Sequence, residues 1–263
     1  MRIVFLALVL FCTFTTIAQE NESFYLFTKN DESTANIKEA AYLQHVKKMN
    51  DSCYVSSYYN FTGSMIRMET FKDYDLSIPF GRFVWYRKND GIDSTGFVLN
   101  GRKDGWWEYT EPDSGKTVRA ESYDNGKLLN RTDYIKRKKY FSDGRVEDID
   151  KTDTTSKDSV VQVEAEFKGG LKAWKQYLSR NIKTPERFIN YFSSGTSLTV
   201  IVSFRIEKDG SVGQVYINRS AEFSVDQEAL RVISSSPKWK PATQNGKPVI
   251  YRQRQALSFV VSE

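Results

Sequence analysis

The chain has 263 residues, of which 40% are hydrophobic, so it is long enough for two small domains with packed cores. Its formal net charge of +5 is mild and does not indicate nucleic-acid binding. The single histidine, His45, excludes a metal site built on several histidines and argues against a Ser-His-Asp triad. Phosphate loops and dinucleotide fingerprints are absent. We therefore predict a protein that is not an enzyme, with no catalytic residue, no metal site and no cofactor.

Residues 1–18 have the pattern of a signal peptide. Arg2 gives a positive start, residues 3–11 are almost purely apolar, and residues 16–18 fit a small-x-small cleavage site. The apolar run is short for a membrane span. We predict cleavage before Gln19 and export to the periplasm. An uncleaved anchor in the inner membrane is the alternative.

Residues 19–146 are predicted to form a meander of repeated β-hairpins. The region is rich in aromatic residues, and segment 81–86 matches segment 105–109 at an offset of 24 residues. After the turns Asn100-Gly101 and Asn125-Gly126, a tyrosine follows nine residues from each asparagine. Asn-Gly pairs supply the positive φ angles that tight hairpin turns need. A repeat of this length indicates one supersecondary unit stacked on its neighbours.

These units resemble MORN-like repeats, the Gly- and Tyr-rich β-hairpins of many exported Bacteroidetes proteins. For Tyr86, Trp107 and Tyr109 we predict packing of one hairpin on the next, because a single-layer meander must bury its large rings. An aromatic platform for a ligand such as a glycan is the alternative. At the start of the region, residues 37–49 favour a strand that turns and returns from Cys53, with a short helix as the alternative.

Residues 147–163 read as a flexible linker, because Lys, Asp, Thr and Ser dominate and no apolar period is visible. A helix follows the linker and is stopped by Pro185. Its apolar residues recur at helical spacing: Leu171, Trp174, Leu178 and Ile182.

The rest of residues 164–263 predicts a three-stranded antiparallel sheet with a second helix. Residues 198–206 alternate apolar and polar, Asp209-Gly210 turns the chain, and a second strand follows. The second helix is predicted to begin at Ser224 with a capping box over 224–227, and Pro237 ends it. The final strand alternates, with Leu257, Phe259 and Val261 on one face and Arg252, Arg254 and Ser258 facing outward. The fold class is therefore α+β after an all-β meander.

Five segments of this region are distinctive: Phe167-Lys168-Gly169-Gly170, Lys208-Asp209-Gly210, Asp226-Gln227-Glu228-Ala229-Leu230, Pro237-Lys238-Trp239-Lys240-Pro241 and Gln244-Asn245-Gly246-Lys247-Pro248-Val249. With these segments, the order of elements over about residues 164–263 resembles the TonB carboxy-terminal domain. Many members of that family have Phe-Pro-Gly-Gly in place of the first segment.

The resemblance implies a domain that binds the TonB box, an extended peptide of an outer-membrane transporter, by strand addition. Carried over by position, the receiving strand is the last one. Its residues are Tyr251, Arg252, Gln253, Arg254, Gln255, Ala256, Leu257, Ser258, Phe259 and Val260. Arg252 and Arg254 would lie beside the incoming peptide, or would only keep an edge strand soluble.

Energy transduction, the family's other property, has less support in this chain. A transducer needs an uncleaved amino-terminal helix and a long Pro-rich spacer, whereas this chain has six prolines and a meander in the spacer's place. The leading hypothesis is a periplasmic protein that binds the TonB box of a TonB-dependent outer-membrane transporter. One alternative is an anchored energy transducer coupled to inner-membrane proton-driven motor proteins. The other is a non-enzymatic envelope scaffold that uses its repeats, and a homodimer is left open.

Overall fold

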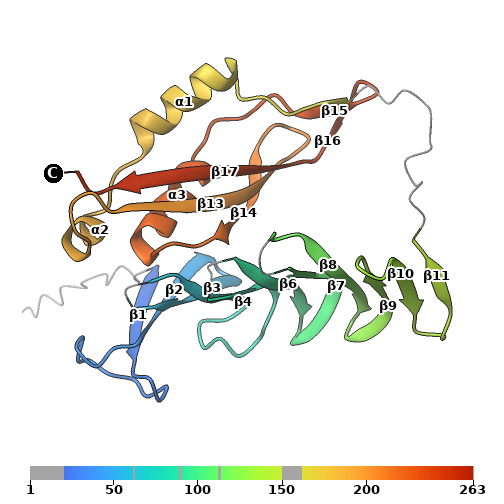
Figure 1. The fold of residues 1–263 in the computed structure, drawn as a ribbon, viewed down its shortest axis with the longest axis horizontal. Helices are drawn as coiled ribbons and strands as arrows, with labels where there is room; N and C mark the ends of the chain where they lie inside the picture. The colour runs from blue at the N-terminus through green and yellow to red at the C-terminus, as the bar shows by residue number, and fades with distance from the viewer. Residues whose placement is uncertain (1–20, 62, 89–90, 112–113, 150–161, 263) are drawn as a thin grey trace, which may run out of the picture.

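The computed structural model describes residues 21–61, 63–88, 91–111, 114–149 and 162–262. The predicted signal peptide, residues 1–18, lies outside these ranges, as does most of the predicted linker. The described chain forms a long antiparallel meander followed by a three-stranded sheet with helices (Figure 1), which confirms the α+β prediction.

The amino-terminal region is a single eleven-stranded sheet in which each strand pairs with the next along the chain (Figure 1). Its strands are β1 (Glu22–Phe27), β2 (Tyr42–Asn50), β3 (Cys53–Asn60), β4 (Met65–Phe71), β5 (Gly81–Tyr86), β6 (Ile92–Leu99), β7 (Arg102–Thr110), β8 (Thr117–Asp124), β9 (Lys127–Asp133), β10 (Lys138–Phe141) and β11 (Val146–Asp148). The predicted strand and return strand at the start of the region are β2 and β3. Identity with MORN repeats stays a prediction.

Both Asn-Gly pairs form the predicted hairpin turns. Asn100 and Gly101 have φ angles of 48° and 77° between β6 and β7, and Asn125 and Gly126 have 45° and 89° between β8 and β9. Positive φ at both central residues is the geometry of a tight hairpin turn. The strands that these turns connect pair directly, from Leu99 with Arg102 and from Asp124 with Lys127.

One face of the meander holds a separate aromatic cluster, defined by Phe71, Phe83, Val98 and Trp107. The Trp107 ring lies flat on β6, where a Cβ on Gly96 would be 2.3 Å from the indole. Its centroid is 5.6 Å from that of Trp85 on β5. Packing of one hairpin on the next is thus confirmed for Trp107.

The carboxy-terminal region contains α1 (Gly170–Asn181), α2 (Glu186–Tyr191) and α3 (Phe223–Ser234) around a three-stranded sheet of order β14-β13-β17. The strands of this sheet are β13 (Ser197–Ile206), β14 (Val212–Arg219) and β17 (Tyr251–Val260). A second small sheet contains β12 (Gln162–Val163), β15 (Ala242–Gln244) and β16 (Lys247–Val249). The two ends of the predicted linker are thus paired, in β11 and β12, and residues 150–161 lie outside the described chain.

Three details differ from the sequence prediction. Pro185 is the N-cap of the additional helix α2, and α1 already ends at Asn181. Leu171, on the predicted apolar stripe, is 67% exposed because α1 turns it away from the sheet. The capping box at Ser224 is wrong: α3 begins at Phe223, and the Glu222 carboxylate accepts hydrogen bonds from both the Ser224 amide (2.8 Å) and the Ser224 hydroxyl (2.6 Å).

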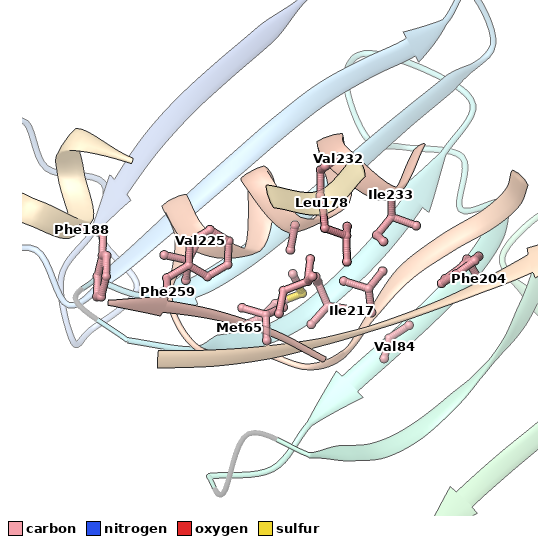
Figure 2. Close-up of a cluster of buried hydrophobic side chains, with 14 of the residues drawn as sticks. Met65, Val84, Leu178, Phe188, Phe204, Ile217, Val225, Val232, Ile233 and Phe259 are labelled. Carbon is pink, nitrogen blue, oxygen red and sulfur yellow. The ribbon is translucent and has the colours of Figure 1, made fainter. Parts of the chain in front are cut away.

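The meander and the carboxy-terminal region share one hydrophobic core (Figure 2). Met65 and Val84 of the meander lie in the same buried cluster as Ile217 of β14 and Val225 of α3. Burial of this kind contributes about 25 cal/mol for each Å² of apolar surface removed from water. The first half of the meander and the carboxy-terminal region are therefore stabilised by the same core. The sequence did not indicate this shared core.

Polar contacts reinforce this shared core. The Tyr86 hydroxyl donates to the carbonyl of Ile217 (2.7 Å), and the Met65 amide donates to Ser220 Oγ (2.6 Å). Tyr86 was predicted to pack between hairpins, but it packs against β14 instead, because its side of the sheet faces the carboxy-terminal region. Arg187 of α2 donates to the Phe61 carbonyl and pairs with the buried Glu222.

Candidate peptide-binding edge

The final strand, β17, lies at one edge of the three-stranded sheet. It pairs with β13 in unbroken register from Ser197 with Val260 to Ile206 with Tyr251. The other side of β17 has no strand partner within the described chain. An edge strand exposes unpaired main-chain donors and acceptors that can pair with another extended chain.

Side chains alternate strictly along this edge, as a half-buried strand requires. Leu257 and Phe259 are buried in the shared core. The predicted outward residues Arg252, Arg254 and Ser258 are exposed. Gln253, Gln255 and Tyr251 are half-buried, and Ala256 and Val260 are exposed. The ten predicted site residues thus form one continuous strand with a buried and an exposed face.

Gln255 links the edge strand to helix α1. The Trp174 indole Nε1 donates to Gln255 Oε1 (2.7 Å), while Gln255 Nε2 donates to the carbonyl oxygen of Ala256 (2.8 Å). One main-chain acceptor of β17 is therefore already engaged by a side chain. Sequence reasoning missed this arrangement, because α1 and β17 lie far apart in the chain and no motif marks the pair.

Three of the segments that carry the TonB resemblance, those with Phe167, Gly210 and Trp239, meet beside Trp174 of α1. Phe167 and Trp174 have ring centroids 5.1 Å apart, and the Trp239 centroid lies 5.0 Å from that of Trp174. Gly210 has φ of 83°, and a Cβ there would lie 2.1 Å from the Trp239 carbonyl oxygen. Only glycine allows that close approach. These motif residues build the frame that holds α1 against the sheet.

The exposed face of β17 is positively charged. Arg252 and Arg254 are not among the residues that form ion pairs in the described ranges. Glu207, the residue after β13, pairs with Arg205 (Oε1 to Nη2, 2.8 Å). Groups of three or more His, Cys, Asp and Glu that could hold a metal ion do not occur in the part of the chain that the structure describes. The β17 edge can therefore pair with the main chain of an extended peptide, and its exposed face presents positive charge beside that peptide.

The segment that contains this edge is similar to a known protein family. Residues 193–261 match the family model of the Gram-negative bacterial TonB protein C-terminal. The match begins just after α2 and covers β13, β14, α3 and β17, so it includes the whole candidate site. No curated protein and no solved structure matches the chain.

The match covers residues 193–261 of a chain of 263 residues, so the similarity to the TonB C-terminal domain is shown for this segment alone. Among the described helices, none combines the length and hydropathy that a membrane span needs.

Proposed function

We propose that this protein binds an extended peptide, the TonB box of an outer-membrane transporter, by adding it as a strand to β17 in the periplasm. The single observation behind the proposal is that β17 forms the open edge of the sheet within the segment that matches the TonB family. In strand addition, main-chain hydrogen bonds supply affinity, and side-chain contacts on alternate residues supply specificity.

The opposite edge of the same sheet is less suited to this role. Strand β14 contacts the meander through a β-bridge between Gly91 and Arg219 and through the Tyr86 hydroxyl at Ile217. Ser220, just beyond β14, accepts a hydrogen bond from the Met65 amide. An incoming peptide would have to displace these contacts. At β17, among the described residues, it would displace the hydrogen bond from the Gln255 side-chain amide to the Ala256 carbonyl.

The shared core gives the meander a structural role in this proposal. Because Met65, Val84 and Tyr86 pack on β14 and α3, the repeats hold the sheet from the side away from β17. A free-standing scaffold of repeats is less consistent with that packing. An anchored energy transducer coupled to a proton-driven motor remains the alternative, and it requires that residues 1–18 are not removed.

Peptides with N-methylated backbones test the proposal. A TonB-box peptide should bind the mature protein, and methylation of successive residues should weaken binding at every second position, because alternate amides of an added strand point toward β17. A loss of about fivefold at each sensitive position is expected from one hydrogen bond. Binding that is insensitive to methylation, or no binding, would contradict strand addition. Amino-terminal sequencing of the mature protein decides between the free and the anchored form.

A further inference from the structure

A cleft of about 500 Å³ lies between the meander and the outward face of the three-stranded sheet. One wall comes from β13, β14 and β17, and the other from β5, β6 and β7, which lie below that sheet in Figure 1. This cleft opens on the sheet face, so it is distinct from the main-chain edge of β17. It exists only because the meander and the carboxy-terminal region are packed together.

The charges that line the cleft are strongly unbalanced. Four arginines, but only one carboxylate, Glu108, lie along its walls: Arg82, Arg205, Arg252 and Arg254. Of the four, only Arg205 forms an ion pair within the described ranges, with Glu207. Guanidinium groups remain protonated in proteins. Glu108 and the Glu207 partner of Arg205 offset only part of this charge, so the described residues give the cleft a net positive charge.

Arg82 is held at the junction of the two walls. Its guanidinium carbon lies 4.7 Å from the ring centroid of Phe97 on β6 and 4.7 Å from that of Tyr216 on β14. Its Nη1 donates to Thr95 Oγ1 (3.1 Å), and within the described residues the other N–H donors of this guanidinium form no hydrogen bond. Burial lowers the pKa of Arg82, and the charge of Arg252 lowers it further. The structure thus places a desolvated cation against other cations.

The sheet wall has two more features that favour a bound anion. Arg205 lies directly opposite Arg252 in the β13–β17 register, and like charges at facing positions of a sheet are destabilising. Ser203, opposite Arg254, is only 6% exposed, and its hydroxyl has no hydrogen-bond partner within the described chain. A buried hydroxyl without a partner costs free energy. An anion in the cleft would relieve the repulsion and would give the Ser203 hydroxyl, which lines the cleft, an acceptor.

We propose that this cleft binds a phosphate monoester group. A phosphate dianion can accept bidentate hydrogen bonds from more than one guanidinium at once, which a single carboxylate does less well. The Trp106 side chain, 54% exposed at the cleft, offers an apolar surface for the organic part of the ester. The phosphate could belong to a soluble ester or to a lipid headgroup, and the experiment distinguishes these sources.

Calorimetric titration of the mature protein with glycerol 3-phosphate, and flotation with vesicles that contain phosphatidic acid, test the proposal. Saturable binding that weakens with added salt is expected in at least one arm. Binding of the soluble ester assigns the phosphate to a free metabolite, and binding of phosphatidic acid vesicles alone, over phosphatidylcholine vesicles, assigns it to a lipid headgroup. Absence of binding in both arms at low salt would overturn the proposal, as would equal binding of succinate.

Three charge-matched variants locate the site. Arg82→Gln and Arg252→Gln should each weaken phosphate binding about tenfold, the loss expected for charge-assisted hydrogen bonds. Arg180→Gln, which removes an exposed arginine from α1, should not change it. Equal loss in all three variants would show a non-specific effect of net charge. Arg82 lies on β5, outside the peptide edge, so Arg82→Gln should leave TonB-box binding intact. The phosphate proposal and the peptide proposal can therefore fail independently of each other. If Arg82→Gln does not fold, Arg252→Gln still decides.

Discussion

The two edges of the carboxy-terminal sheet differ in what covers them. Ile217 on β14 is 1% exposed and lies in the shared core with residues of the meander, whereas Val260 on β17 is 52% exposed. The Tyr86 hydroxyl and the bridge from Gly91 reach the main chain of β14, and β17 pairs only with β13 in the described chain. The meander thus closes one edge of a small sheet and leaves the other open.

This difference explains how a small sheet can be stable and still have an edge open to pairing with another strand. A sheet of three strands needs a packed face to persist, and an open edge is a risk for aggregation. The meander stabilises the β14 side, while two exposed arginines on β17 disfavour pairing with other copies of the chain. The following predictions separate the two edges, beginning with the largest expected effect.

Asp226 lies beneath the covered edge and should make stability depend on pH. It is fully buried, and burial raises its pKa to about 8, although Ser220 Oγ donates to it (2.5 Å). Its usual pKa is 3.8, so the folded protein retains a proton that the unfolded chain releases. Stability from this group is full below pH 4 and is lost as pH rises toward 8, at roughly 1.4 kcal/mol per pH unit.

Asp226→Asn should remove this dependence, because an amide resembles the neutral acid. Urea unfolding between pH 5 and pH 8 checks the prediction, with the wild-type protein losing stability relative to the variant as pH rises. Parallel curves for the two proteins would show that Asp226 is ionised in the folded state and that the assigned protonation is wrong.

Truncation of one apolar side chain on each edge tests the comparison directly. Ile217→Ala should lower the free energy of unfolding by about 2–5 kcal/mol, because it leaves a cavity in the shared core. Val260→Ala on β17 should change it by less than about 0.5 kcal/mol, since the side chain is exposed. Chemical denaturation of both variants measures the difference. Equal losses would mean that the two edges are buried alike.

Gln255 should set how readily β17 accepts a partner. Gln255→Glu keeps an acceptor for the Trp174 indole but removes the donor to the Ala256 carbonyl. TonB-box affinity should rise about threefold relative to Gln253→Glu, which adds the same charge on the same strand, because one main-chain acceptor becomes free. Fluorescence anisotropy with a labelled peptide measures both variants. Equal affinities would show that this carbonyl takes no part in binding.

The sequence predicts regular local elements well and tertiary contacts poorly. The Asn-Gly turns predict the ends of β6 to β9, and the alternation of apolar and polar residues predicts β17. Both signals lie within a few neighbouring residues of the sequence. Helix α2 was missed, since six residues are too few to show a helical period. The cap of α3 was placed at Ser224 because nothing local shows that Glu222 is buried against Arg187.

The same contrast between local and tertiary information holds for the candidate sites. The ten residues of β17 follow from the family resemblance and the alternation of a single strand. The arginine cleft could not be predicted, because its walls come from six strands in two regions, and Arg82 and Arg252 are far apart in the sequence. Tyr86 shows the same limit: its repeat pattern predicts a hairpin contact, and only the fold shows that it meets β14.

Amide hydrogen exchange with and without a TonB-box peptide tests the central claim most directly. The claim is that β17 is the receiving edge and β14 is not. Exchange in residues 251–260 should slow on adding peptide, while exchange in residues 212–219 and in the meander should stay unchanged, because only new main-chain hydrogen bonds protect amides at the edge. Slowed exchange in β14, or no change in β17 at saturating peptide, would contradict the account.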